Sequence, residues 1–191
     1  MLYLASRSPR RRRLLRELGR PFRIVRSRYR ETIRPDDPPA RNAVRNAVGK
    51  ARGARLPARP PGLVVGADTF LYFQGCILGK PRNLAHARRM LRALSGRSHW
   101  VYTGVCVYEP ATGRQRAGYA KTKVTFKALS DETIARLFRR ASPMDKAGAY
   151  ALQADRGDLI QRIEGSRTNV IGLPLELLRR ELGRMRTHDS Y

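Results

Sequence analysis

The sequence predicts a mixed α/β fold, in which helices cover a β-sheet. Short apolar segments that suit buried strands alternate along the chain with segments whose apolar residues recur at helical spacing. Two pairs of strand segments are separated by turn residues and therefore indicate hairpins. The 191 residues contain no internal repeat and no long polar linker. We therefore expect one domain over residues 1–191, large enough to bury its own core.

The first third of the chain predicts three strands and two helices. The strands cover residues 2–5, 22–25 and 63–69. Ser8 followed by Pro9 is typical of an N-cap and a first helical position, so the first helix begins there. The second helix is basic and covers residues 38–56, with its alanines spaced to face the core.

The remaining elements continue this alternation. We expect hairpin strands at 70–73 and 76–78 and again at 99–108 and 117–126, and helices at 84–94, 130–140 and 174–184. Residues 145–152 and 159–163 are expected to be irregular or to form strands. Asn83 and Ser130 precede two of these helices and are typical N-cap residues. Cys76 and Cys106 fall inside strand segments, where each would act as a small apolar residue.

Arginine dominates the charged residues of this chain. The formal net charge is +25, and 34 of the 40 basic residues are arginine. Such a charge attracts polyanions, and its simplest interpretation is affinity for nucleic acid. However, the arginines are spread along the sequence, aromatic residues make up 7%, and no zinc-finger, basic-zipper or RNA-recognition motif is present. The sequence therefore disfavours a dedicated nucleic-acid-binding module and leaves non-specific affinity as the expectation.

The sequence also predicts where the protein works. No apolar run is long enough to span a bilayer, so we expect no membrane partner. The apolar start of the chain precedes its arginines, which is the reverse of a secretory signal. The two cysteines form neither a CxxC pair nor a Cys/His ligand set. These features favour a reducing compartment, and we expect a cytoplasmic protein.

The segment LASRSPRR brings hydroxyl and guanidinium groups to the start of the first helix. Free backbone N–H groups and a partial positive charge make a helix start favourable for anions. With Ser6, Arg10 and Arg11 nearby, this helix start could hold a phosphate chain. The alternative is simple helix capping followed by a solvated basic helix.

Two further positions have the chemistry of a phosphate-cleaving site. Asp68 ends a buried apolar strand, where ligands usually bind in open α/β sheets, and could hold a metal or take a proton from water. Lys80 lies between a glycine and a proline, and its ammonium could neutralise charge on a transferring phosphoryl group. The alternatives are an aspartate that starts a local turn and a lysine in a surface turn.

Two polar segments complete this set. Small residues surround Lys146, and Gln153 follows soon after; its amide could donate to and accept from the edge of a base. Residues 165–174 form a polar loop that leads into the last helix. The alternatives are a tight structural turn for the first segment and an ordinary helix entry for the second.

In this order along the chain, these segments resemble the motifs of the Maf family of nucleotide pyrophosphatases. The resemblance extends from Leu4 to about Leu182. The matching pieces are LASRSPRR, Glu31, the Lys50-Ala51 pair, VVGADT, LGKP, MLRALSGRSHWVYTGV, DKAGAYALQ and GSRTNVIGLPL. The resemblance implies a twisted mixed sheet with flanking helices, similar to that of inosine triphosphate pyrophosphatases, with two lobes around a nucleotide-binding cleft.

The resemblance also implies an activity, namely cleavage of nucleoside triphosphates between the α- and β-phosphates with Mg²⁺ or Mn²⁺ as cofactor. By matching position, Asp68 would be the proton acceptor, and Asp68 and Glu31 would bind the metal. The other implied roles are catalysis by Lys80, phosphate binding by Ser6, Arg10 and Lys50, and base selection by Arg11, Thr69 and Gln153.

Thr69 and Gln153 match the subgroup that acts on dTTP and UTP, and sometimes on modified pyrimidine nucleotides. The subgroup that prefers 7-methyl-GTP has other residues at these two positions. Family analogy also implies a homodimer. Arg7, Arg12 and Arg13 exceed what the motifs require and could add affinity for nucleic acid. The rival hypotheses are a basic nucleic-acid-binding protein and a regulator of cell division, both without turnover.

Overall fold

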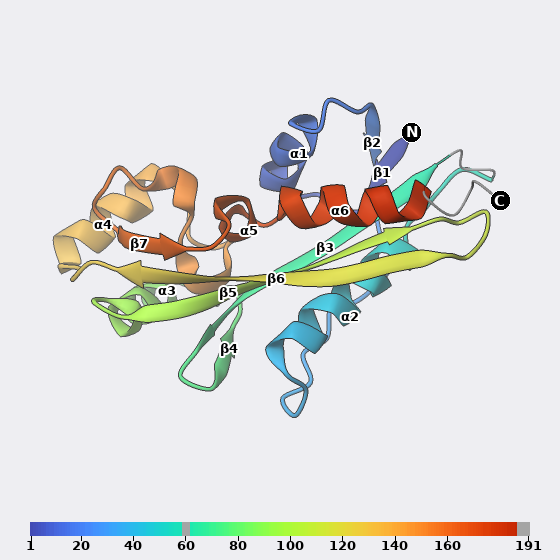
Figure 1. Cartoon of the computed structure of the whole chain (residues 1–191). Coiled ribbons are helices and arrows are strands. Elements are labelled where there is room, and N and C mark those ends of the chain that lie inside the picture. Colours follow the sequence, from blue (N-terminus) through green and yellow to red (C-terminus); the bar gives the residue numbers. More distant parts are fainter. Residues whose placement is uncertain (59–61, 187–191) are drawn as a thin grey trace. The chain divides into compact units, whose positions relative to one another are not determined.

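The computed structural model describes residues 1–58 and 62–186, and these residues contain one mixed sheet of seven strands (Figure 1). The strands are β1 (Leu2–Leu4), β2 (Phe22–Ile24), β3 (Leu63–Phe73), β4 (Cys76–Leu78), β5 (Ser98–Tyr108), β6 (Gln115–Phe126) and β7 (Ile160–Glu164). Their order is β2-β1-β3-β5-β6-β7, with β4 paired to β3. β1 is parallel to β2 and β3, whereas the β3–β4 and β6–β7 pairs are antiparallel. This sheet with flanking helices confirms the predicted fold class.

The helices agree with the predicted ones, apart from one addition and from the helix predicted over 38–56, which ends at Arg52 because Gly53 caps it and Ala54 forms a β-bridge with Ser27. They are α1 (Pro9–Arg16), α2 (Pro39–Arg52), α3 (Leu84–Leu94), α4 (Asp131–Arg140), α5 (Arg167–Ile171) and α6 (Leu175–Arg186), with short 3₁₀ turns η1 (Ala147–Ala149) and η2 (Leu152–Ala154). The predicted N-caps Ser8, Asn83 and Ser130 are confirmed, since each side chain accepts a bond from the backbone N–H three residues later. α5 was not predicted because five residues are too few to show helical periodicity. No helix in the described residues has the length and apolarity needed to cross a membrane.

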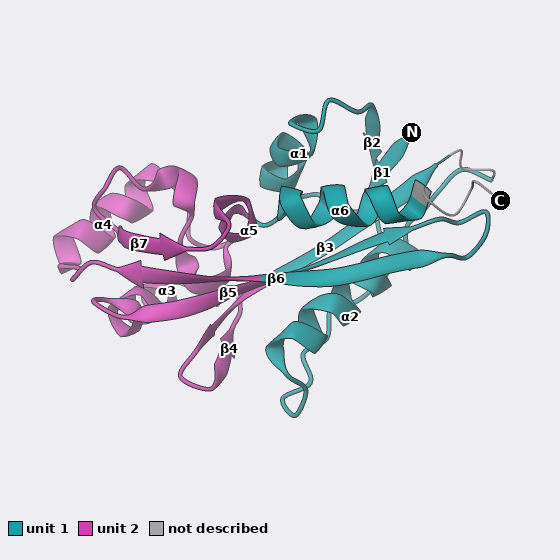
Figure 2. Cartoon of the chain, viewed as in Figure 1, with its two compact units in different colours: residues 1–69, 103–120, 172–191 teal, residues 70–102, 121–171 magenta. Residues whose placement is uncertain are grey.

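The chain divides into two compact units, each assembled from separate stretches of sequence (Figure 2). Unit 1 comprises Met1–Thr69, Thr103–Ala120 and Gly172–Tyr191, and unit 2 comprises Phe70–Tyr102 and Lys121–Ile171. Strands β3, β5 and β6 each contain a boundary and contribute residues to both units. The two units correspond to the two expected lobes, while a single domain over residues 1–191 stays a prediction.

In unit 1, α2 packs directly on the backbone of β3 and β5 because both strands present a glycine to it. A Cβ atom on Gly66 would lie 2.2 Å from the Ala47 carbonyl oxygen, and one on Gly104 would lie 2.2 Å from the Ala43 carbonyl oxygen. The buried apolar residues around this contact are Tyr3, Ala5, Ala47, Ala51, Val64 and Cys106. α6 lies on the opposite side of these strands (Figure 2). This close packing determines where the polar residues of α2 lie.

Unit 2 has its own core, built around three aromatic rings. His99, Phe126 and Tyr150 contact one another edge to face, with ring centroids between 4.8 and 5.5 Å apart. His99 Nε2 and the Tyr150 hydroxyl form a hydrogen bond of 2.8 Å. Burial lowers the pKa of His99 to about 4, so the ring is neutral at pH 7. The apolar residues that α3 and α4 add to this core are Ala87, Met90, Leu91, Leu94, Ile134 and Leu137.

The GSRTN segment has a structural role in unit 2. The buried Asn169 side chain donates to the Val101 carbonyl oxygen at 3.1 Å and to Thr122 Oγ1 at 2.8 Å. These bonds join α5 to β5 and β6, and they favour the simpler interpretation of this segment as a helix entry.

Two expectations about β3 and β4 are corrected. β3 is one continuous strand of 11 residues, so Asp68 lies within it rather than at its end. The chain stays extended through Asp68 because the start of β3 pairs with β1 and its last three residues pair with β4. Cys106 is buried as expected, but Cys76 is exposed, because β4 lies off the main strand order and has β3 as its described partner.

Candidate active site

A buried polar face of α2 organises the candidate site. Asn42, Asn46 and Lys50 occur four residues apart and therefore lie on one face of the helix. All three side chains are buried. Burying a polar group costs free energy unless the group forms a hydrogen bond or an ion pair. The partners of these three side chains are therefore the other residues of the site.

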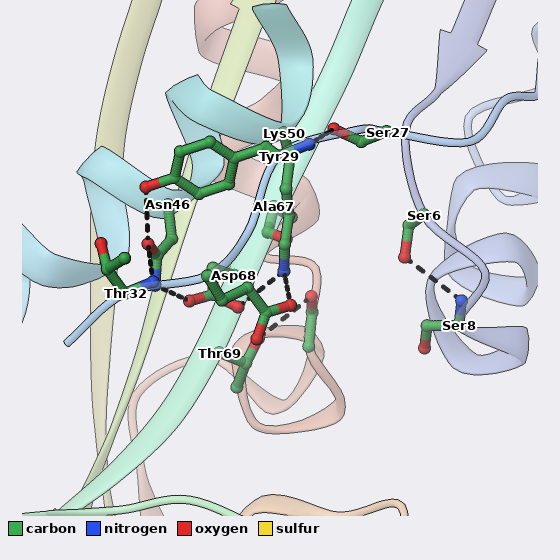
Figure 3. A network of polar contacts seen from close by, with 12 residues as sticks. Ser6, Ser8, Ser27, Tyr29, Thr32, Asn46, Lys50, Ala67, Asp68 and Thr69 are labelled. Atoms are coloured by element: carbon green, nitrogen blue, oxygen red, sulfur yellow. Dashed lines mark hydrogen bonds and ion pairs between the residues drawn. The ribbon is translucent and has the colours of Figure 1, made fainter. Parts of the chain in front are cut away.

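Lys50 joins two acidic residues. Its Nζ lies 2.8 Å from Asp68 Oδ1 and 3.3 Å from the Ala67 carbonyl oxygen (Figure 3). The same Nζ lies 2.5 Å from Glu31 Oε1. Asp68 is 6% exposed, whereas the Glu31 side chain is 56% exposed. This cluster is therefore buried on its Asp68 side and reachable by solvent on its Glu31 side.

Asn46 holds the other oxygen atom of Asp68. Its Nδ2 donates to Asp68 Oδ2 at 2.7 Å, while its Oδ1 accepts from the Tyr29 hydroxyl at 3.0 Å and from the Thr32 N–H at 3.1 Å (Figure 3). Both oxygen atoms of Asp68 thus have a donor from α2. The carboxylate is held in one orientation.

The segment that carries Glu31 has neither helix nor strand between residues 28 and 34, and side chains of α2 secure it. Asn42 accepts from the Arg34 N–H at 2.8 Å and donates to the carbonyl oxygens of Arg34 and Asp37 at 2.9 and 3.1 Å. The Tyr29 ring lies against Gly49, where a Cβ atom would be 2.2 Å from Tyr29 Cε2. Gly49 therefore gives Tyr29 the space it needs to reach Asn46.

Arg11 is the centre of a second cluster in unit 1. Its guanidinium donates to the Gly172 carbonyl oxygen at 2.8 Å, to Thr69 Oγ1 at 3.0 Å and to Ser6 Oγ at 3.4 Å. Thr69 Oγ1 also lies 2.9 Å from Thr103 Oγ1. The structure thus brings together Ser6, Arg11 and Thr69, three of the residues that the sequence predicted.

The start of α1 concentrates positive charge beside this cluster. Burial lowers the pKa of the Arg11 guanidinium, the carboxylates of Asp68 and Glu31 raise it, and the neighbouring Arg10 lowers it further. The Ser8 N–H donates to Ser6 Oγ at 3.2 Å (Figure 3). Cations and hydroxyls at a helix start are the groups that bind phosphate in proteins.

Two predicted site residues belong to unit 2 and are not among the groups gathered around Asp68 in unit 1. Lys80 is exposed directly after β4, and the preceding Gly79 carbonyl accepts the Gly148 N–H at 3.1 Å. Gln153 is exposed in η2. Lys146 donates to the Ser142 carbonyl oxygen at 2.6 Å, which favours the interpretation of its segment as a structural turn.

The groups around Asp68 suit a divalent cation that binds together with a phosphate. Within residues 1–58 and 62–186, no group of three or more His, Cys, Asp and Glu side chains is placed to hold a metal. Asp68 and Glu31 nevertheless converge on one ammonium group. Mg²⁺ typically takes one or two carboxylates and completes its coordination with water and substrate phosphates. Two carboxylates and a nearby helix start rich in cations fit that pattern.

Sequence reasoning missed Asn42, Asn46, Tyr29 and Thr103. Asparagine is a weak helix former, so two of them spaced four residues apart, with a lysine four residues later, were a detectable polar stripe. The contacts of Tyr29 and Thr103 had no such signal, because their partners lie 17 and 34 residues away in the sequence.

A mixed α/β fold, a buried carboxylate held by a lysine and a cation-rich helix start are features of a phosphate-cleaving hydrolase. A model of the Maf-like protein family matches residues 1–185, and the chain belongs to this family. The dTTP/UTP pyrophosphatase of Moorella thermoacetica is 46% identical over 174 residues, which cover 91% of this chain and 89% of the relative. The dTTP/UTP pyrophosphatase of Thermococcus gammatolerans is 44% identical over 185 residues, which cover 96% of this chain and 97% of the relative. These matches confirm the predicted family.

Proposed function

We propose that this chain hydrolyses dTTP and UTP to the nucleoside monophosphate and pyrophosphate. The observation that carries the proposal is the buried Asp68 carboxylate, held on one oxygen by Lys50 and on the other by Asn46. A positioned carboxylate beside phosphate-binding cations suits the attack of water on a phosphoryl group. Relatives named dTTP/UTP pyrophosphatase that match along about nine-tenths of the chain or more support the same reaction.

In the proposed step, water attacks the α-phosphorus and Asp68 accepts the proton that the water loses. The new oxygen–phosphorus bond forms as the bond to the bridging oxygen breaks, and pyrophosphate leaves with that electron pair. Lys50 and Asn46 hold the carboxylate in one orientation, so that little rearrangement is needed when water attacks.

Cations supply the second part of the mechanism. Ser6 and Arg10 at the start of α1, and Lys50 on α2, are proposed to bind the phosphates. Lys80 is proposed to neutralise charge that develops on the leaving pyrophosphate. Its exposure after β4 leaves the ammonium accessible to a ligand.

We further propose that Glu31 and Asp68 hold Mg²⁺ or Mn²⁺ when nucleotide is bound. Such an ion would neutralise charge on the phosphate oxygens. The exposure of Glu31 supports this role, since its carboxylate can gain a ligand without being removed from a buried site.

Base selection is proposed to depend on Arg11, Thr69 and Gln153. Arg11 and Thr69 already form a hydrogen bond of 3.0 Å, and Thr103 supports Thr69 from β5. The Gln153 amide can both donate and accept, as can the edge of thymine or uracil.

Three accessory proposals concern the surroundings of the enzyme: a homodimer, a cytoplasmic location and non-specific affinity for nucleic acid. The last is supported by Arg7, Arg12, Arg13 and Arg16, whose side chains form no ion pair with a carboxylate of the described residues. The rival hypotheses without turnover leave the arrangement around Asp68 unexplained and gain no support from the named relatives.

The test is pyrophosphate release from dTTP, UTP, CTP, GTP, 7-methyl-GTP and ATP, with Mg²⁺ or Mn²⁺ and with EDTA as control. We expect metal-dependent release from dTTP and UTP. Release from other bases alone would keep the reaction and contradict the base assignment. No release from any of them would contradict the proposal and favour its rivals.

The Asp68→Asn variant tests the role of the carboxylate within this assay. Loss of a general base typically costs about 10²- to 10⁴-fold in rate, and we expect a loss of that order with fold and nucleotide binding retained. Near-normal turnover in this variant would remove Asp68 from the role of proton acceptor.

A further inference from the structure

The Asn46 amide contacts two different parts of the candidate site with its two ends. Its oxygen faces the Thr32 N–H and the Tyr29 hydroxyl, and its nitrogen faces Asp68 Oδ2 (Figure 3). A backbone N–H can only donate, so the Thr32 contact requires the amide oxygen on that side. The amide nitrogen therefore points to the carboxylate.

Burial makes these contacts hard to replace with water. Asn46 is 1% exposed and Asp68 is 6% exposed. Removing the amide would leave Asp68 Oδ2, the Tyr29 hydroxyl and the Thr32 N–H without this partner at the same time. One side chain thus serves an acceptor on β3 and two donors on the Glu31 segment.

Lys50 does not duplicate this function. Its ammonium bonds Asp68 Oδ1 and Glu31 Oε1, but an ammonium is a compact charge whose three donors rotate freely. The planar amide of Asn46 has defined donor and acceptor directions. It therefore sets the angle of the carboxylate, which a point charge does not.

We propose that Asn46 is a positioning residue, which orients Asp68 towards the attacking water and holds the Glu31 segment in place beside it. Thr32 directly follows Glu31, so the bond to the Thr32 N–H acts on the backbone next to the proposed metal ligand. This inference rests on the proposed function, because it takes Asp68 as the proton acceptor.

The chain offers two matched controls. Asn42 lies one turn earlier on the same buried face of α2, and its hydrogen bonds go to Arg34, Asp37 and Arg45 rather than to Asp68. Asn42→Ala therefore reports the cost of losing a buried asparagine from this helix. Tyr29→Phe removes one bond to the Asn46 oxygen and leaves the bond to Asp68 intact.

The experiment compares these variants with Asn46→Ala in dTTP turnover and in calorimetric binding of α,β-methylene-dTTP, an analogue that resists cleavage at this bond. For Asn46→Ala we expect kcat to fall about 10- to 100-fold, as for other residues that orient a reacting group, with affinity for the analogue kept within about threefold. In Asn42→Ala and Tyr29→Phe both hydrogen bonds to Asp68 remain, so we expect kcat to fall less in these variants than in Asn46→Ala.

Two further measurements extend the test, and the first of them uses a second variant in case Asn46→Ala folds poorly. Asn46→Asp keeps the oxygen that faces Thr32 but places a second carboxylate oxygen against Asp68 Oδ2, where the two negative charges repel, so kcat should fall at least as far as in Asn46→Ala. In Asn46→Ala, deuterium uptake over residues 29–34 should be faster than in the wild type, because the Thr32 amide loses its acceptor.

A kcat equal to that of the wild type in the Asn46 variants would overturn the proposal. A loss of kcat in Asn42→Ala as large as that in Asn46→Ala would also overturn it, because it would indicate a general structural effect. Unchanged deuterium uptake would overturn the link to the Glu31 segment. A wild type that releases no pyrophosphate would instead contradict the proposed function. The exchange measurement would then still decide whether Asn46 holds the segment.

Discussion

Three oxygen atoms surround the ammonium of Lys50, and their arrangement explains why an arginine-rich chain has a lysine at this position. The oxygens belong to Glu31, Asp68 and Ala67 and lie between 2.5 and 3.3 Å from Nζ. An ammonium directs three donors from one atom and suits acceptors that converge on a point. A guanidinium is planar and longer, so it cannot occupy the same buried position.

Lys50→Arg is therefore expected to impair turnover although it keeps the charge. The larger fork should displace Asp68 or Glu31, and kcat/KM for dTTP should fall by at least about tenfold. Lys127→Arg is the control, since Lys127 is exposed and its Nζ donates to the Gly157 carbonyl oxygen at 2.8 Å. Equal activity in both variants would show that position 50 needs only a positive charge.

At the scale of elements, the site depends on how closely α2 approaches the sheet. Gly66 on β3 lies two residues before Asp68, and the backbone of α2 occupies the space that a side chain at Gly66 would need. The helix that holds the carboxylate and the strand that carries it are thus in direct contact. A change in their separation would move both hydrogen bonds to Asp68.

Gly66→Ala is expected to lower the free energy of unfolding by about 1–3 kcal/mol and to reduce turnover, because the new methyl group forces α2 away from β3. Gly183→Ala is the matched control. Gly183 is exposed in α6, and apart from the helix's own backbone no atom of the described residues lies within 4 Å of the added Cβ, so alanine there should stabilise by about 0.5–1 kcal/mol through helix propensity. Urea unfolding of both variants measures these changes, and a neutral Gly66→Ala would refute the close-packing argument.

The aromatic core of unit 2 predicts a pH dependence of stability. Burial lowers the pKa of His99 to about 4 from an ordinary value of 6.5, so between these pH values the unfolded chain binds a proton that the folded chain does not. The contribution of His99 to the free energy of unfolding is therefore fully present above pH 6.5, falls as the pH drops towards 4, and is constant below that. The loss is about 3 kcal/mol at most.

His99→Gln keeps a hydrogen-bonding group opposite Tyr150 but does not titrate in this range. We expect the variant to be less stable at pH 7, with a weaker decline of unfolding free energy between pH 6.5 and 4. Urea unfolding at several pH values measures the two slopes. Identical slopes would mean that other groups account for the acid sensitivity.

At the scale of the whole molecule, the excess of positive charge is unevenly compensated. Arg92 forms an ion pair with Asp131 at 2.7 Å, and Arg140 forms one with Asp158 at 2.8 Å. The arginines of α1 have a different environment, since Arg12 and Arg13 form no ion pair with the described carboxylates. The first 34 residues contain 12 arginines and two glutamates. Uncompensated charge of this kind attracts polyanions.

We expect weak binding of duplex DNA that declines steeply with salt. In an Arg12→Gln/Arg13→Gln variant, the plot of log affinity against log salt concentration should become less steep by about one to two, because each lost phosphate contact reduces the steepness by about one. An Arg92→Gln/Arg140→Gln variant removes the same charge from ion-paired positions and should change the slope less. Fluorescence anisotropy of labelled duplex DNA at several salt concentrations measures the affinity of each variant and hence its slope. Equal effects of both variants would indicate that only net charge matters.

Local patterns in the sequence were enough to predict most elements of the fold. The N-caps Ser8, Asn83 and Ser130 and the turn between β3 and β4 depend on residues at most a few positions apart. For the same reason, the short α5 and the uninterrupted course of β3 through Asp68 were not anticipated. The first lacks periodicity, and the second depends on neighbouring strands.

The sequence alone determined the element order, the mixed α/β class and the family, because each depends on local residue patterns or on motifs in a fixed order. Only the tertiary structure decided that Asn46, 22 residues before Asp68, supplies the second hydrogen bond to its carboxylate. That contact exists because glycines on β3 and β5 let α2 approach the sheet, which brings its polar face over the strand. Partners so far apart along the chain are chosen by packing in three dimensions, and no local pattern contains that information.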